Sequence, residues 1–180
     1  MENILTNYKC HVKCVDDTNP ISPLQRPRGM SGTAVCYKHE ISNSVIEKPD
    51  GSMRNIVIKV NIKPKSLLVI GVYMPCRGGA DADNEYREIV DEISELVLKY
   101  KSLCDIVIAG DMPNSRDKIF LDFIKEHYLY TPSGLGHENT YFHPSGTSST
   151  QTDYIMESTP GLINNYNLGS SVSSFKHISA

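Results

Sequence analysis

Two apolar runs of strand length constrain the fold of this chain more than any other feature. LLVIGVYMP covers residues 67–75 and DIVIAGD covers residues 105–111, and neither run alternates apolar with polar side chains. Continuous apolar runs are typical of strands covered on both faces, whereas a strand with one wet face alternates. The sequence therefore predicts a sheet whose strands are covered by other elements.

The segment between the two runs has the pattern of an amphipathic helix. Residues 84–100 read NEYREIVDEISELVLKY, with Asp83 as a suitable N-cap. The predicted apolar stripe comprises Ile89, Ile93, Leu96, Val97 and Tyr100. A second helix is predicted near RDKIFLDFIKEH, residues 116–127. Strands that alternate with crossover helices indicate an α/β or α+β class with a mixed sheet.

The flanking segments predict further strands. TAVCYKHEI, residues 33–41, is rich in β-branched and apolar residues, and a turn at 48–52 separates it from NIVIKVNIKP, residues 55–64. The second segment alternates, so we expect an antiparallel strand with one wet face. Two short strands are expected at NTYFHP and TDYIME, and the polar chain through roughly Arg28 is expected to be a loop.

Composition narrows the class of protein. A length of 180 residues suits one domain over 1–180. A net charge of -3 gives no global basic field, so a DNA substrate would need a local site. No apolar run is long enough to span a membrane, and the N-terminus lacks a signal-peptide pattern. The 5 cysteines are scattered singly, which favours reduced thiols and an intracellular, nuclear or cytoplasmic location.

Four polar residues stand where predicted strands end. They are Tyr73 in GVYMP, Asp111 in AGD, Asp153 in TDYIM and His177 in FKHIS. Phosphodiester hydrolysis needs a group that positions water, a partner for developing negative charge and usually a divalent metal. Aspartate supplies hard oxygen for Mg²⁺, and an Asp–His pair fixes the imidazole tautomer.

The order of the motifs VYMP, VIAGD, NTY, TDYIM and S-x-x-H resembles the endonuclease/exonuclease/phosphatase superfamily. It is most similar to the apurinic-endonuclease-like domains of non-LTR retrotransposons, from about Asn7 to His177. The resemblance implies a four-layered α/β sandwich of two mixed sheets flanked by helices. It also implies cleavage of phosphodiesters or phosphomonoesters with Mg²⁺ or Mn²⁺, with DNA as partner.

The resemblance assigns roles to individual residues. Tyr73 would contact the scissile phosphate, and Asp111 would orient or deprotonate the attacking water and contact the metal. Asp153 would hold the catalytic His177, and Thr140 would line the site from its strand.

Several positions depart from the family pattern. Pro113 stands where G-D-x-N has its asparagine, and Asn114 follows one residue later. Asn114 is a substrate-binding candidate, but its position before RDKIF favours a helix N-cap. Lys176 precedes His177 where the family has aspartate, and Cys76 replaces an asparagine. The family's metal-binding glutamate and its early asparagine have no counterpart upstream, so the chain resembles an N-terminally truncated member.

Two classes of function therefore remain open. One is an impaired Mg²⁺-dependent endonuclease, and the other is a catalytically dead remnant or a nucleic-acid- or protein-binding module with the same fold. A zinc site from Cys10, Cys14, Cys36 and His39 is a weaker alternative to isolated thiols.

Overall fold

A five-stranded mixed sheet forms the centre of the molecule, in the strand order β3-β4-β5-β6-β9. The structure is a computed structural model that describes residues 7–14, 32–75, 82–112, 118–132, 139–143 and 145–163. The strands of this sheet are β3 (Val45–Glu47), β4 (Asn55–Val60), β5 (Ser66–Tyr73), β6 (Cys104–Asp111) and β9 (Asp153–Glu157). Strands β5 and β6 are parallel, and the other neighbours are antiparallel. The two apolar runs are thus central strands, as the sequence predicted, and the structure pairs them with each other.

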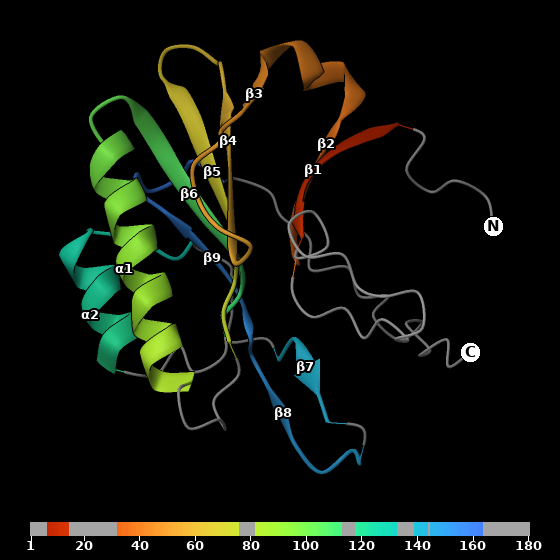
Figure 1. Cartoon of the computed structure of the whole chain (residues 1–180), viewed down its shortest axis with the longest axis vertical. Coiled ribbons are helices and arrows are strands. Elements are labelled where there is room, and N and C mark those ends of the chain that lie inside the picture. Colours follow the sequence, from red (N-terminus) through yellow and green to blue (C-terminus); the bar gives the residue numbers. More distant parts are fainter. Residues whose placement is uncertain are drawn as a thin grey trace.

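Two helices cover one face of this sheet (Figure 1). Helix α1 (Ala82–Tyr100) connects β5 to β6 as the crossover, and α2 (Lys118–Glu126) packs beside it. The predicted α1 stripe is buried with Phe120 and Phe123 of α2. Asp83 lies inside the first turn rather than at the N-cap, because α1 begins at Ala82. The N-cap prediction was therefore wrong, although an acid in the first turn still suits the helix dipole.

A two-stranded antiparallel sheet of β1 (Tyr8–Cys14) and β2 (Gly32–Lys38) packs on the opposite face. The two sheets approach closely at Gly71 of β5. A Cβ atom on Gly71 would lie 2.8 Å from Val35 Cγ2 and 2.9 Å from Ile56 Cγ2. The described residues thus form three layers: helices, central sheet and second sheet. This confirms the predicted α/β sandwich class, but the second sheet is antiparallel rather than mixed, and the described residues include no outer helix layer on it.

Two predictions about these strands were wrong. Residues 8–14 were expected to be loop, but they form β1, because tertiary pairing with β2 overrides a weak local pattern. Strand β4 was expected to have a wet face, yet Ile56, Val57 and Ile58 are all buried. The reason is that α1 covers the face that alternation assigned to water, since Val57 packs in the core cluster with α1 and Asn55 Nδ2 donates to Glu92 of that helix.

The expectation of scattered, reduced cysteines was also wrong for two residues. Cys10 and Cys36 stand directly opposite each other in the β1–β2 pair and form a disulfide. Cysteines that pair across strands need not be near in sequence, so spacing alone concealed the bond. Cys14 and Cys104 are free thiols.

A small hairpin of β7 (Tyr141–Phe142) and β8 (Ser149–Thr150) projects beyond the central sheet, at the lower end in Figure 1. A six-residue 3-10 helix, η2 (His39–Ser44), leads from β2 to β3. Within the described ranges, no helix combines the length and apolarity needed to cross a membrane.

Candidate active site

Three of the predicted site residues are neighbours in the central sheet. Tyr73 ends β5 and pairs with Asp111, which ends β6, and Asp111 in turn pairs with Asp153, the first residue of β9. Directly paired residues on adjacent strands project from the same face, about 5 Å apart. The sheet topology therefore gathers Tyr73, Asp111 and Asp153 at one rim, although they come from three separate segments of sequence.

The glycine before Asp111 is required by the backbone. Gly110 has φ +151, and a Cβ atom there would lie 1.8 Å from the carbonyl oxygen of Val72. No other residue can occupy this position without separating β5 from β6. The Gly-Asp pair therefore lets the strands stay paired up to the rim, where the carboxylate of Asp111 is presented.

The environment of the Asp111 carboxylate disfavours its charged form. Its Oδ1 oxygen is buried and has no hydrogen-bond partner among the described residues. Burial raises the pKa of the Asp111 carboxyl, and the neighbouring Asp153 carboxylate raises this pKa further. An unpaired, partly buried carboxylate beside a second carboxylate is an arrangement that a cation would relieve.

A divalent cation fits these two aspartates. Both supply the hard oxygen ligands that Mg²⁺ prefers, and Mg²⁺ is commonly held by one or two carboxylates plus water and substrate phosphate. The described residues contain no group of three or more His, Cys, Asp or Glu that could hold a metal. The zinc alternative fails in particular, because Cys10 and Cys36 are bonded to each other.

Thr140 contacts the backbone that leads into β9. Its Oγ1 oxygen accepts hydrogen bonds from the backbone N–H groups of Thr152 and Asp153, both at 3.0 Å. This contact fixes where β9 begins and hence where Asp153 stands at the rim. Thr140 therefore holds the backbone beside Asp153.

Two predicted site residues, His177 and Asn114, lie outside the described residues, as do Cys76 and Lys176.

Sequence reasoning missed one residue at this rim, Arg54. Arg54 immediately precedes β4, its carbonyl accepts a hydrogen bond of 2.8 Å from the Tyr73 N–H, and its guanidinium carbon lies 5.4 Å from the Tyr73 ring centroid. Pairing the alternating segment 55–64 against the run 67–75 would have revealed Arg54 as a neighbour of Tyr73.

Comparison with solved structures identifies the fold. An endonuclease/exonuclease/phosphatase family protein from Leptotrichia buccalis C-1013-b matches with TM-score 0.54 and 15% identity, covering 86% of this chain and 60% of that one. The endonuclease domain of TRAS1, a telomere-specific non-LTR retrotransposon, matches with TM-score 0.51 and 12% identity, covering 68% and 56%. No protein-family model matches the sequence, and no curated protein matches it as a relative.

These likenesses show that the chain has the endonuclease/exonuclease/phosphatase fold, so the resemblance inferred from the motifs is confirmed at the level of the fold. The chain spans only about three fifths of the length of either structure.

Proposed function

We propose that this chain carries the catalytic rim of a metal-dependent phosphodiesterase that acts on DNA in the manner of an endonuclease. The observation that carries the proposal is the row of Tyr73, Asp111 and Asp153 on three adjacent strands. One of the two fold neighbours is itself an endonuclease domain. The activity of a longer relative does not transfer with the fold, so the proposal depends on the chemistry of this rim.

The rim residues have complementary roles in this reaction. The raised pKa of Asp111 makes its carboxylate a better proton acceptor, so it would orient and deprotonate the attacking water. Tyr73 is 37% exposed, and its hydroxyl would donate a hydrogen bond to a phosphate oxygen. Asp153 would orient the imidazole of His177 and stabilise its protonated form.

Mg²⁺ or Mn²⁺ would be held by Asp111, with Asp153 beside it. The bound cation would supply charge neutralisation at the phosphate. The buried, unpartnered Oδ1 of Asp111 supports this assignment. The ligand set is incomplete within the described residues, so we expect weak metal binding and low turnover in this chain.

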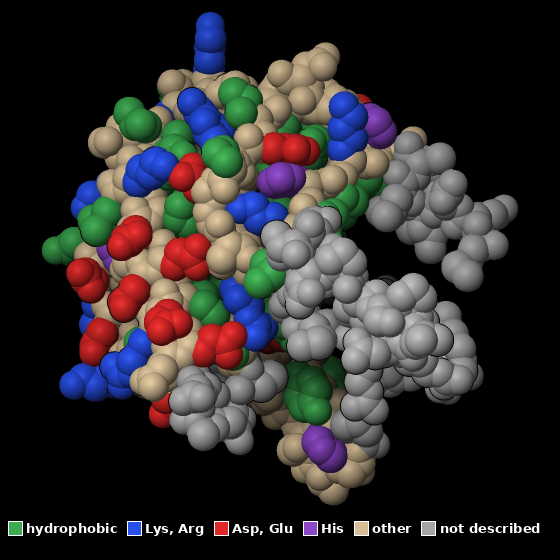
Figure 2. Space-filling view, in the orientation of Figure 1, with side chains coloured by type: hydrophobic (Ala, Val, Ile, Leu, Met, Phe, Trp, Pro, Cys, Tyr) green, Lys and Arg blue, Asp and Glu red, His purple; other side chains and the backbone are tan. Residues whose placement is uncertain are grey.

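The charge distribution limits how a polyanion can approach. Exposed acidic side chains gather over α1, on the left of Figure 2, and they include Asp83, Glu88, Asp91 and Glu95. These carboxylates would repel nucleic acid from the helical face. DNA would therefore reach the molecule at the strand-end rim.

A plasmid-nicking assay with Mg²⁺ tests the proposed activity. We expect nicking that EDTA abolishes and that Asp111→Asn and His177→Ala each reduce by about 100-fold or more, because general-base catalysis contributes about that much. Asp122→Asn on the exposed face of α2 and His39→Ala on η2 are matched controls that should retain activity.

Two results would contradict the proposal. Nicking that persists in His177→Ala and Asp111→Asn would remove the mechanism. DNA binding without any nicking would favour the alternative, a non-catalytic binding module with the same fold.

A further inference from the structure

The Cys10–Cys36 disulfide lies on the outer face of the β1–β2 sheet. Successive residues of a strand point to opposite faces, and in β2 the buried Thr33 faces the central sheet whereas the residues at 34, 36 and 38 are exposed. Cys36 is therefore on the solvent side, and its partner Cys10 is half-buried. A disulfide with one exposed cysteine is open to attack by a thiolate from solution.

The two strands joined by this disulfide have little other support from a sheet of their own. Among the described residues, β1 and β2 pair only with each other. A two-stranded sheet is marginally stable by itself, and the disulfide links strands that are 26 positions apart in sequence. We therefore expect the β1–β2 sheet to loosen when the disulfide is opened.

The inward face of the β1–β2 sheet holds the segment 47–54, which leads into β4. Thr33 Oγ1 of β2 donates a hydrogen bond of 3.0 Å to the Met53 carbonyl. Lys13 Nζ of β1 donates to the Pro49 carbonyl at 3.1 Å and also to the Asp50 carbonyl. Both strands thus hold backbone carbonyls of this segment.

The residues that follow the two cysteines contact one carboxylate at the start of the same segment. Tyr37, next to Cys36, donates a hydrogen bond of 3.2 Å to Glu47 Oε1. His11, next to Cys10, places its Nδ1 atom 3.2 Å from Glu47 Oε2. The disulfide therefore holds together the two side chains that converge on Glu47.

The segment 47–54 connects this sheet to the rim. Its last residue is Arg54, and the Arg54 carbonyl accepts a hydrogen bond of 2.8 Å from the Tyr73 N–H. A second connection is direct packing: Val35, next to Cys36, lies against Gly71, where an added Cβ atom would be 2.8 Å from Val35 Cγ2. Gly71 is two residues before Tyr73 in β5, so both connections reach the same strand end.

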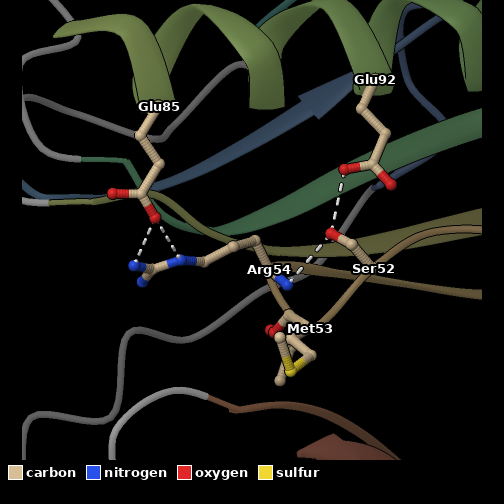
Figure 3. Close-up of polar contacts among 6 residues, drawn as sticks. Ser52, Met53, Arg54, Glu85 and Glu92 are labelled. Carbon is tan, nitrogen blue, oxygen red and sulfur yellow. Dashed lines mark hydrogen bonds and ion pairs between the residues drawn. The ribbon is translucent and has the colours of Figure 1, made fainter. Parts of the chain in front are cut away.

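Helix α1 holds the other side of the segment 47–54 (Figure 3). The Arg54 guanidinium donates to Glu85 Oε1 at 2.7 Å, and Ser52 Oγ donates to Glu92 Oε2 at 2.9 Å. These contacts do not involve β1 or β2. Loss of the β1–β2 contacts would therefore loosen the segment without detaching it from the molecule.

We propose that the Cys10–Cys36 disulfide is a redox-sensitive device, and that thiol exchange at Cys36 controls the order of the segment 47–54 and of the rim at Tyr73. A thiolate of a dithiol reductant attacks Cys36 Sγ, the bond between the two Sγ atoms breaks, and Cys10 leaves as a thiolate that takes a proton from solvent. The second thiol of the reductant then displaces Cys36. The reductant ends as a disulfide, and the chain gains two electrons, two protons and two thiols.

Alkylation followed by mass spectrometry tests the exchange step in the native protein. Without denaturant, dithiothreitol should make Cys10 and Cys36 reactive toward iodoacetamide within about an hour, because exchange at an exposed disulfide is not limited by unfolding. Cys104, which is 1% exposed, should stay unmodified and reports that the core remains folded.

Hydrogen exchange of the oxidised and reduced chains tests the connection to the rim. We expect reduction to speed exchange of the Tyr73 amide about tenfold or more, because an amide exchanges when its hydrogen bond opens. The amides of residues 106–108 in β6 should be unchanged. The double variant Cys10→Ser, Cys36→Ser should exchange like the reduced chain with or without dithiothreitol, and the control Cys14→Ser should respond as the unmodified chain does.

Three outcomes would overturn the inference. They are alkylation of Cys10 and Cys36 only in denaturant, reduction that leaves exchange of the Tyr73 amide unchanged, and a response to dithiothreitol that persists in the double variant. If the double variant does not fold by circular dichroism, reoxidation of the unmodified chain decides, since slow exchange must return with the disulfide. None of these measurements requires nicking, so failure of the proposed function would leave this inference standing.

Discussion

The carboxylate of Asp111 is in an unfavourable environment. A carboxylate that is partly buried, lacks a described partner at Oδ1 and stands beside Asp153 is costly to keep ionised. Gly110, directly before Asp111, has a φ of +151. Because it lacks a Cβ atom, its backbone can lie against the carbonyl oxygen of Val72 in β5. The Gly-Asp pair therefore places a glycine that the backbone requires directly before a carboxylate whose Oδ1 has no described partner.

Replacing Asp111 by Asn should stabilise the metal-free protein at neutral pH. The pKa of Asp111 is raised in the folded state, so the native chain binds this proton more readily than the unfolded chain does. The destabilising contribution of the ionised group is present above the folded pKa and fades as the pH falls through it. We expect a gain of about 1 kcal/mol at pH 7 that disappears below pH ~4, measured by urea unfolding in EDTA. A variant less stable than the wild type at pH 7 would contradict this reasoning.

Gly110→Ala should be strongly destabilising. A Cβ atom would lie 1.8 Å from a backbone oxygen, which no side-chain adjustment can relieve, so β5 and β6 must separate near the rim. We expect a loss of about 2 kcal/mol or more in the free energy of unfolding, together with loss of nicking. Gly146→Ala is the control, since a Cβ atom there meets nothing within 4 Å, although its positive φ carries a smaller strain.

At the scale of elements, tertiary packing determines which strand faces are buried and which cysteines meet, and the local sequence pattern does not. Helix α1 covers the expected wet face of β4, and the pairing of β1 with β2 brings Cys10 opposite Cys36. The turn after β3 also joins this sheet to the rest, because Lys13 Nζ donates to the Pro49 carbonyl at 3.1 Å and also to the Asp50 carbonyl. The second sheet is thus attached to the rest of the molecule by apolar packing and polar contacts, and the disulfide joins its two strands.

Removing the disulfide should weaken the protein. The bond links residues separated by 26 positions, and closing a loop of that size restricts the unfolded chain by about 3 kcal/mol. We expect Cys36→Ser to lower the denaturant midpoint accordingly, whereas the control Cys14→Ser, which removes a free thiol, should change it much less. Equal midpoints for Cys36→Ser and the wild type would show that the bond does not form in solution.

At the scale of the whole molecule, the sandwich brings one rim of the central sheet together. Strands β5, β6 and β9 contribute Tyr73, Asp111 and Asp153 in register, beside the β7–β8 hairpin (Figure 1), and Arg54 precedes β4 next to Tyr73. Acidic side chains gather over α1 (Figure 2), and Glu85 in the first turn of that helix contacts Arg54 of the row.

Mg²⁺ should stabilise the folded chain through the two rim carboxylates. A ligand that binds only the native state raises the free energy of unfolding by RT ln(1 + [L]/Kd), which is about 2.7 kcal/mol at 100 times Kd. We expect the melting temperature to rise with Mg²⁺ and to return with EDTA. Asp111→Asn and Asp153→Asn should lose most of this shift, whereas Asp122→Asn should keep it. An equal shift in all four proteins would place the cation elsewhere.

Much of the fold followed from residue pattern alone. The two apolar runs and the helical stripe from Ile89 to Tyr100 specified two central strands and their crossover helix, because burial on both faces and helical spacing leave direct traces in sequence. The order of motifs also named Tyr73, Asp111 and Asp153 before their positions were known. The sequence did not predict Arg54 at this rim, because Arg54 belongs to no motif and lies there only through its contact with Tyr73 on the paired strand.

The sequence by itself determined which segments are strands and helices at the centre and which polar residues end them. Only the tertiary structure decided that β1 is a strand, that Cys10 bonds Cys36 and that four strand ends align in one row. The physical reason is range: periodicity reports the burial of each segment locally, whereas register and sheet-on-sheet contact depend on residues far apart along the chain.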